Sequence, residues 1–172
     1  MLRTKFHIVT PWEIQSQGVF LQAIDFYSER LRTKGSCDFM HLRPCRNGDE
    51  DKIFDPILVN FRRSNVAVAC LDERAKALTS EELAQWIAGA QLRGCSAQAF
   101  VLGGAYGLPG GLATDGTLFS FKLSNMTLPH ELALLVLVEQ LYRAQCILTK
   151  HPYHHAEPSA FSKALHRNFG KP

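Results

Sequence analysis

The sequence predicts an α/β protein with a mainly parallel sheet and helices on both faces. Two short apolar runs, residues 66–71 and 97–102, are bounded by polar residues, as expected of parallel strands that are buried on both sides. Segments in which apolar residues recur at helical spacing alternate with these and other strand-like segments. Such alternation is typical of α/β domains with a mainly parallel sheet.

The first half of the chain begins with a short strand expected over residues 6–9. Apolar residues then recur at helical spacing over residues 17–33, and alternation over 39–42 predicts a second strand. A polar loop around Gly48 follows. A helix that ends near Arg63 is expected after it, with Pro56 close to its start.

The second half continues the alternation after the apolar run at 66–71. Thr79 and Glu82 have the spacing of a capping box, which predicts a helix start, and Gly94 is a typical helix end. The glycine-rich segment 103–111 is expected to be a loop, and residues 118–123 alternate like a strand. The last helix is expected from about Pro129 to Leu148.

Composition is ordinary for a globular protein and fits one domain over residues 1–155, followed by a polar, basic extension over 156–172. The net charge of +3 permits an anionic partner without requiring one. No apolar run approaches the roughly 18 residues of a membrane span, so no membrane partner is expected. Five cysteines without a CxxC pair favour a reduced, intracellular compartment.

The last helix is apolar on nearly every face, with leucine or valine at 132, 134–138 and 141. Such a helix needs burial on all sides. It is either the central helix of the core or a helix that packs on a partner chain. We favour a homodimer, because a domain of this size seldom encloses a helix completely.

Three loops follow predicted strands, at residues 71–74, 103–107 and 124–129. Ligands of open α/β sheets bind outside the carboxyl ends of the strands, so these loops are candidates for a binding site. Gly103 and Gly104 either let a ligand approach the backbone or serve only a tight turn. Neither GxGxxG nor GxxxxGK[ST] occurs here, and a nucleoside triphosphate is therefore not expected.

The segment after the last helix, His151-Pro-Tyr-His-His155, gathers titratable and aromatic groups. Tyr153 can stack on a base, and the histidines can meet phosphate or assist proton removal. They can also be bystanders on the surface. No second pair of Cys or His lies nearby at ligand spacing, so no metal is expected.

Several blocks of the chain resemble one known family. They are Leu71-Asp-Glu-Arg74, Phe100-Val-Leu-Gly-Gly-Ala105, Leu123-Ser-Asn-Met-Thr-Leu-Pro-His130, Glu139-Gln-Leu-Tyr-Arg-Ala144 and His151-Pro-Tyr-His154. These five blocks, in order and at matching spacing, resemble the ribosomal large-subunit RNA methyltransferase H family of the SPOUT class.

The resemblance implies a C-terminal trefoil knot and a homodimer whose active sites are shared across the interface. It implies S-adenosyl-L-methionine as cofactor and methylation of N3 of a pseudouridine in large-subunit rRNA, on the ribosome. It also implies roles for individual residues. These are cofactor binding for Leu71, Gly103, Gly104, Ser124, Asn125, Met126, Thr127, Leu128 and Pro129; catalysis for Tyr153, His154 and His130; and RNA binding for Arg143 and His155. Lys163 and Arg167 are further RNA-binding candidates because they are cations of the basic extension, where the family normally has no residues.

Leu134 and His155 stand where members of this family usually carry arginine. The loss of two fixed charges leaves an alternative open, a non-catalytic assembly factor of the same fold that binds rRNA as a dimer. Both the bacterial cytoplasm and the mitochondrial matrix suit these expectations.

Overall fold

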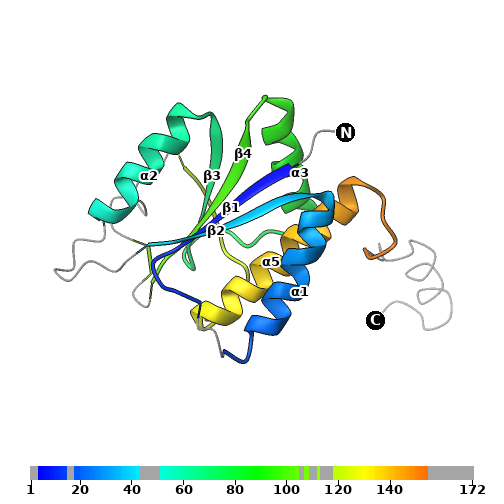
Figure 1. Ribbon diagram of the computed structural model, residues 1–172, viewed down its shortest axis with the longest axis horizontal. Helices are drawn as coiled ribbons and strands as arrows, with labels where there is room; N and C mark the ends of the chain where they lie inside the picture. Colours follow the sequence, from blue (N-terminus) through cyan, green and yellow to red (C-terminus); the bar gives the residue numbers. More distant parts are fainter. Residues whose placement is uncertain are drawn as a thin grey trace, which may run out of the picture.

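Strands and helices alternate in the predicted order (Figure 1). The structure, a computed structural model, describes residues 4–14, 18–42, 51–104, 107, 108, 112 and 118–154, without the side chains of residues 51 and 52. Its elements are β1 (Thr4–Thr10), α1 (Leu21–Lys34), β2 (Gly35–His41), α2 (Asp51–Arg63), β3 (Val66–Leu71), α3 (Ser80–Leu92), β4 (Ala97–Leu102), β5 (Phe119–Phe121) and α5 (His130–Leu148).

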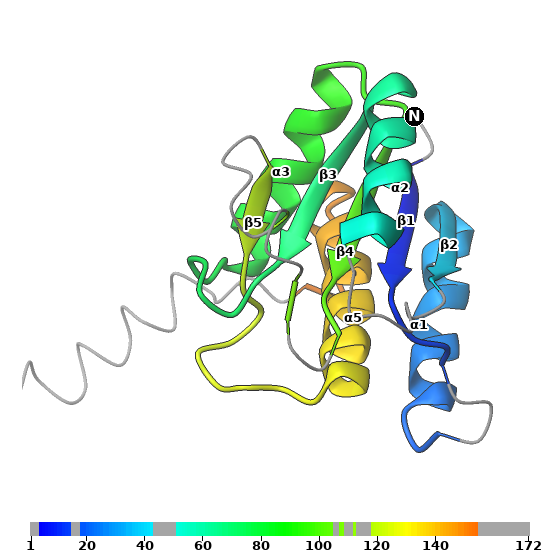
Figure 2. The ribbon, with the colours of Figure 1, turned by 90° about the vertical axis from the view of Figure 1, so that its left-hand side faces the viewer.

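The five strands form one sheet in the order β2-β1-β4-β3-β5. Every pairing between neighbouring strands is parallel, which confirms the predicted sheet. β4 lies in the middle and all six of its residues are buried. Because all strands point the same way, their carboxyl ends meet at one edge of the sheet (Figure 2).

Helices cover both faces of the sheet, as predicted. Helices α1, α3 and α5 pack on the face that carries Ile8 and Phe100, and they form one core cluster with these residues. Helix α2 packs on the opposite face through Phe54, Leu58 and Phe61. Neighbouring residues of a strand point to opposite faces, so Val9 and Val101 belong to this second core.

Several predicted boundaries were wrong. Helix α1 begins at Leu21 rather than at residue 17, and residues 15–17 lie outside the described part of the chain. Strand β2 begins at Gly35, four residues before the predicted start, because an edge strand keeps polar residues such as Asp38 on its exposed side. Strand β5 spans only Phe119–Phe121 of the predicted 118–123.

Other local predictions are confirmed. Thr79 and Glu82 form the capping box at the start of α3. Gly94, just past its end, has a φ of 75°, in the left-handed region that glycine adopts easily. No described helix combines the length and apolar character that crossing a membrane requires.

Helix α5 lies between α1 and α3, and its inner side is completely buried. The opposite side is not: Leu132, Leu135 and Val136 are only half-buried, and Leu148 is 37% exposed. The prediction of a helix buried on all sides therefore does not hold within one chain. Part of its apolar surface remains at the surface of the described protomer.

Candidate functional site

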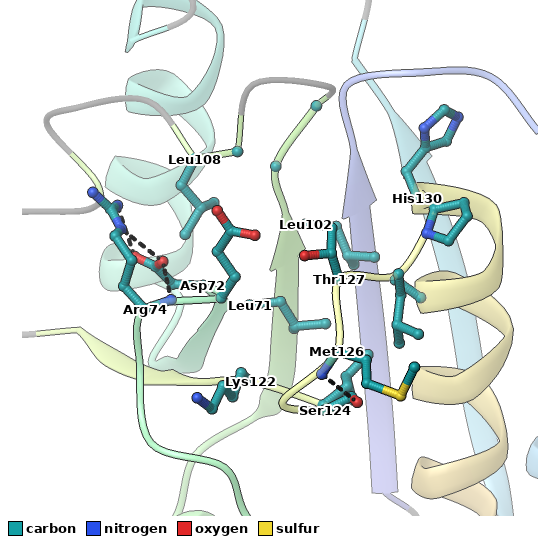
Figure 3. A pocket seen from close by; sticks show the side chains of 18 of the residues that line it. Leu71, Asp72, Arg74, Leu102, Leu108, Lys122, Ser124, Met126, Thr127 and His130 are labelled. Carbon is teal, nitrogen blue, oxygen red and sulfur yellow. Dashed lines mark hydrogen bonds and ion pairs between the residues drawn. The ribbon is translucent and has the colours of Figure 1, made fainter.

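A cleft of about 630 Å³ lies at the carboxyl edge of the sheet (Figure 3). Three loops from distant parts of the sequence line it, after β3, after β4 and between β5 and α5. Of the residues expected to bind cofactor, the cleft is lined by Leu71, Gly103, Gly104, Ser124, Met126, Thr127, Leu128 and Pro129. Asn125 does not line it and is exposed to solvent.

The first loop is fixed by its own ion pair and by backbone bonds to β5. The Asp72 carboxylate accepts two side-chain hydrogen bonds from Arg74, at 3.0 and 2.9 Å, and one from the backbone of Arg74. The side-chain bonds from Arg74 hold the pKa of Asp72 below its usual value. The backbone N–H of Asp72 donates to the carbonyl of Phe121 at 3.0 Å, so the first loop is anchored to the last residue of β5, after which the third loop begins.

The second loop turns sharply. The N–H of Gly107 donates to the carbonyl of Gly104 at 3.0 Å. A Cβ on Gly103 would stand 2.2 Å from the carbonyl carbon of Gly107, so only glycine fits there. Gly103 therefore serves the tight turn, which was one of the two alternatives for this pair. Gly104 lines the cleft without a left-handed φ.

The third loop shapes the wall next to α5. The hydroxyl of Ser124 accepts a hydrogen bond from the backbone of Met126 at 2.9 Å, which bends the chain. The Met126 side chain is 77% exposed although it borders the cleft. Pro129 is the residue before the first turn of α5, and His130 opens the helix at the edge of the cleft.

Trp12 and Lys122 are among the lining residues that were missed from the sequence. Trp12 follows β1 and tilts against the His130 ring, with the ring centroids 4.7 Å apart. Its position could have been predicted, because the segment after β1 lies at the same edge of the sheet as the loops after β3, β4 and β5. Lys122 enters from the end of β5. Lys122 belongs to the segment 118–123, which was predicted to be a strand. Nothing in the sequence therefore indicated that Lys122 lines a cleft.

Tyr153 and His154 do not line the cleft of their own chain. The Tyr153 phenol donates to Oε1 of Glu139 at 2.9 Å and lies 3.3 Å from the hydroxyl of Tyr27. Burial, and then the hydrogen bonds with Tyr27 and Glu139, raise the pKa of Tyr153 well above its usual value. His154 Nε2 lies 3.2 Å from Oε1 of Glu81 at the start of α3. Within one chain, these two predicted catalytic residues and the cleft are therefore separate.

Of the four predicted RNA-binding residues, only Arg143 belongs to the described part of the chain. Arg143 is half-buried, pairs with Glu139 at 2.7 Å, and lies over the ring of Tyr153, 5.0 Å from its centroid. His155, Lys163 and Arg167 lie outside the described residues. Leu134, at the position of an expected arginine, is fully buried in the core beneath the sheet. An apolar side chain suits that position in this chain.

An all-parallel α/β sheet with a loop-lined cleft at its carboxyl edge is the arrangement of proteins that bind a small ligand at this edge. A family model described as predicted SPOUT methyltransferase matches residues 5–154, and the chain belongs to this family. Several relatives that match the chain are named ribosomal RNA large subunit methyltransferase H. The one from Clostridium botulinum (strain Hall) is 32% identical over 141 residues, 77% of this chain and 88% of the relative.

The relative from Nitratidesulfovibrio vulgaris is 49% identical over 88 residues, 51% of this chain and 56% of that protein. The one from Thiobacillus denitrificans is 51% identical over 85 residues. The chain thus matches about half the length of these two relatives. A probable methylase family protein from Haemophilus influenzae has a similar fold, with a TM-score of 0.54 at 12% identity over 96% of this chain and 80% of the other.

Proposed function

We propose that this protein methylates N3 of a pseudouridine in large-subunit ribosomal RNA, with S-adenosyl-L-methionine as methyl donor. The observation that carries the proposal is the convergence of three sequence-distant loops on one cleft. Its volume of about 630 Å³ lies within the range of roughly 300–1,000 Å³ that is typical of small-molecule sites. Family membership and the names of the relatives support the reaction class and the RNA substrate.

The lining of the cleft suits this cofactor. Adenine is recognised by backbone donors and acceptors, and Gly104, which has no side chain, lines the cleft together with the 124–129 loop. Asp72, Arg74 and Lys122 supply both signs of charge around the cleft, as a zwitterionic amino-acid group requires. The cofactor, when bound, supplies a methyl group already activated on a sulfonium. The protein then mainly has to align the acceptor with this methyl.

The acceptor nitrogen of pseudouridine carries a proton that must leave. His130 stands at the edge of the cleft and is exposed, so it is a candidate to receive this proton. Tyr153 holds its own proton near neutral pH, since the ordinary pKa of tyrosine is about 10 and the surroundings of Tyr153 raise it further. We therefore propose that Tyr153 forms a hydrogen bond to the substrate. His154, the next residue, is proposed to take part in catalysis beside it.

We further propose a homodimer in which Tyr153 and His154 of one chain complete the cleft of the other. Two observations support it: these residues lie away from their own cleft, and α5 keeps half-buried leucine and valine side chains at its surface. Sedimentation equilibrium tests it, with an expected mass twice the 19.3 kDa of the chain. A mass of one chain at micromolar concentration would contradict it.

The trefoil knot of the SPOUT class is also proposed for this chain. Strand β5 pairs with β3 on the side away from β4, and α5 then returns beneath the sheet between α1 and α3. This path of the C-terminal region supports the proposed knot. In the same proposal, residues 1–155 form one domain, and 156–172 form an extension near the RNA. The bacterial cytoplasm and the mitochondrial matrix both suit this function.

A non-catalytic assembly factor of the same fold is the second candidate. It is favoured by Leu134, which is buried in the core where the family usually carries arginine. Calorimetric titration with S-adenosyl-L-methionine separates the two, because a methyltransferase must bind it. Absence of heat at high micromolar ligand favours the assembly factor. Tandem mass spectrometry of rRNA from cells that lack the protein then tests the reaction, since the methyl mark should vanish.

A further inference from the structure

Two aromatic rings from distant parts of the sequence meet at the edge of the cleft. Among the described residues that line it, Trp12 and His130 carry the only aromatic rings. Trp12 follows β1, and His130 is the first residue of α5. The ring centroids lie 4.7 Å apart and the ring planes are tilted by 57°. The two rings therefore form a corner, and a flat molecule stacked on the indole would lie beside the imidazole.

The backbone of Trp12 is fixed by the ends of two strands. The hydroxyl of Thr10 donates to the carbonyl of Trp12 at 2.8 Å. Nδ1 of His41 lies 2.9 Å from that hydroxyl and 3.1 Å from the same carbonyl. Thr10 and His41 are the last residues of β1 and β2. The position of Trp12 is thus set before a ligand binds, which lowers the entropy cost of binding.

The indole of Trp12 is half-buried and belongs to two environments. It packs against the core cluster formed with α1, α3 and α5, and it also lines the cleft. The indole N–H is buried and has no acceptor among the described residues. An unpaired buried donor costs free energy, so a hydrogen bond within the described chain does not account for a tryptophan here. What the residue offers to the cleft is a large flat surface.

We propose that Trp12 is a substrate-binding residue, on which the acceptor base stacks. The inference rests on the proposed function, in which N3 of a pseudouridine must reach the methyl donor. Enzymes that act on a base take it out of the RNA stack and hold it between aromatic or apolar side chains. A base stacked on Trp12 lies beside His130, the candidate to receive the proton of N3. The proposed homodimer adds the hydrogen-bonding group of Tyr153 from the other chain.

The adenine of the cofactor is the other flat ring that this cleft would receive. Two observations favour the acceptor base on Trp12. Gly104 and the 124–129 loop, which are proposed to hold the cofactor, line the cleft without an aromatic ring. His130, the neighbour of Trp12, is exposed to solvent, and RNA reaches the cleft from the solvent side. Adenine on Trp12 would make cofactor affinity depend on this residue, and the test below measures that affinity.

The test compares variants of Trp12 in methyl transfer to large ribosomal subunits from cells that lack the protein. Trp12→Leu keeps apolar contacts with the core but has no flat face, and it should lower kcat/KM about tenfold. Trp12→Phe keeps an aromatic face and should stay within about threefold. Calorimetry should show that affinity for S-adenosyl-L-methionine changes less than about twofold in both variants. Trp12→Met is a second variant without a ring, because methionine adapts to irregular core gaps. Melting temperatures report which variants are folded.

Trp86→Phe is the matched control. Trp86 stacks on Phe119, with ring centroids 5.1 Å apart, and does not line the cleft. This variant should keep the kcat/KM of the unsubstituted protein.

Three results would overturn the inference and leave the proposed function standing. The first is unchanged transfer in the folded variants that lack a ring. The second is an equal loss of transfer and of cofactor affinity, which would assign Trp12 to the cofactor. The third is an equal loss in Trp12→Phe and Trp12→Leu, which would assign the indole N–H rather than the ring face. If the unsubstituted protein transfers no methyl group, the proposed function fails and the inference fails with it.

Discussion

The phenol of Tyr153 donates a 2.9 Å hydrogen bond to Glu139, and the same carboxylate oxygen accepts from Arg143 at 2.7 Å. Glu139 therefore connects the segment after α5 to the middle of the helix. Burial, and then the hydrogen bonds with Tyr27 and Glu139, raise the pKa of Tyr153. Near neutral pH this side chain is a hydrogen-bond donor rather than a base.

Replacing Tyr153 with phenylalanine should lower methyl transfer by at least tenfold while cofactor affinity changes less than twofold. The phenol is lost, but no residue that lines the cleft within a single chain is changed. Single-turnover methylation of an rRNA fragment and calorimetry with S-adenosyl-L-methionine measure the two quantities. Tyr27→Phe is the control, because it removes the 3.3 Å contact and keeps the bond from Tyr153 to Glu139. Equal losses of transfer and affinity in Tyr153→Phe would argue against its placement.

Gly104→Val should abolish cofactor binding and leave the fold intact. The added side chain occupies the cleft, and the backbone at Gly104 has no left-handed φ that would strain a larger residue. Calorimetry should show at least a 100-fold loss of affinity for S-adenosyl-L-methionine, about 2.7 kcal/mol, with a melting temperature near that of the unsubstituted protein. Retained binding would mean that the cofactor lies elsewhere.

Gly103→Ala should behave differently, because its Cβ would collide with the backbone of Gly107. The loop must shift, so stability and cofactor affinity should fall together. We expect a loss of about 1–3 kcal/mol in the free energy of unfolding, measured by urea denaturation. An unchanged midpoint in urea would contradict the close contact at this turn.

The capping box of α3 should contribute measurably to stability. Thr79 accepts from the backbone of Glu82 at 3.1 Å, and Glu82 accepts from the backbone of Thr79 at 2.8 Å. Thr79→Ala should cost about 1 kcal/mol in urea denaturation. Thr79→Ser keeps the accepting oxygen and should stay within about 0.5 kcal/mol. Similar losses in both variants would point to packing of the methyl group instead.

The pair of Asp72 and Arg74 gives stability a defined dependence on pH. The pKa of Asp72 is lowered in the folded protein, so its contribution is present above its unfolded pKa of about 3.9. It is lost as pH falls through the lower folded value. Asp72→Asn should reduce the melting temperature by about 1–3 °C at pH 7. The difference should shrink below about pH 4; a difference that grows there would contradict the pairing.

The central strands and the cleft were predictable from the sequence for physical reasons. Strands β3 and β4 are buried on both faces, so their apolar runs are continuous and easily recognised. The loops that follow them and β5 meet at one edge because the strands are parallel. The start of β2 was missed because an edge strand keeps polar residues on its exposed side.

The place of Tyr153 was not predictable from spacing. After α5 the chain turns through Lys150, which adopts a left-handed φ of 54° although it is not glycine. The N–H of His151 then donates to the carbonyl of Cys146 at 2.8 Å, and Tyr153 folds back toward Glu139. No glycine marks this reversal in the sequence, so the distance between Tyr153 and the cleft became known only from the structure.

The order of the strands in the sheet has a consequence for how the protein is made. Strand β1 leaves the ribosome before the other strands of this sheet, yet Phe6 pairs with Gln98 of β4, which is synthesised much later. Until β4 emerges, one side of β1 has no neighbouring strand. The backbone N–H and C=O groups on that side of β1 are then unpaired. Productive folding is therefore delayed until most of the polypeptide is translated, and slow pairing of this kind favours protection by chaperones.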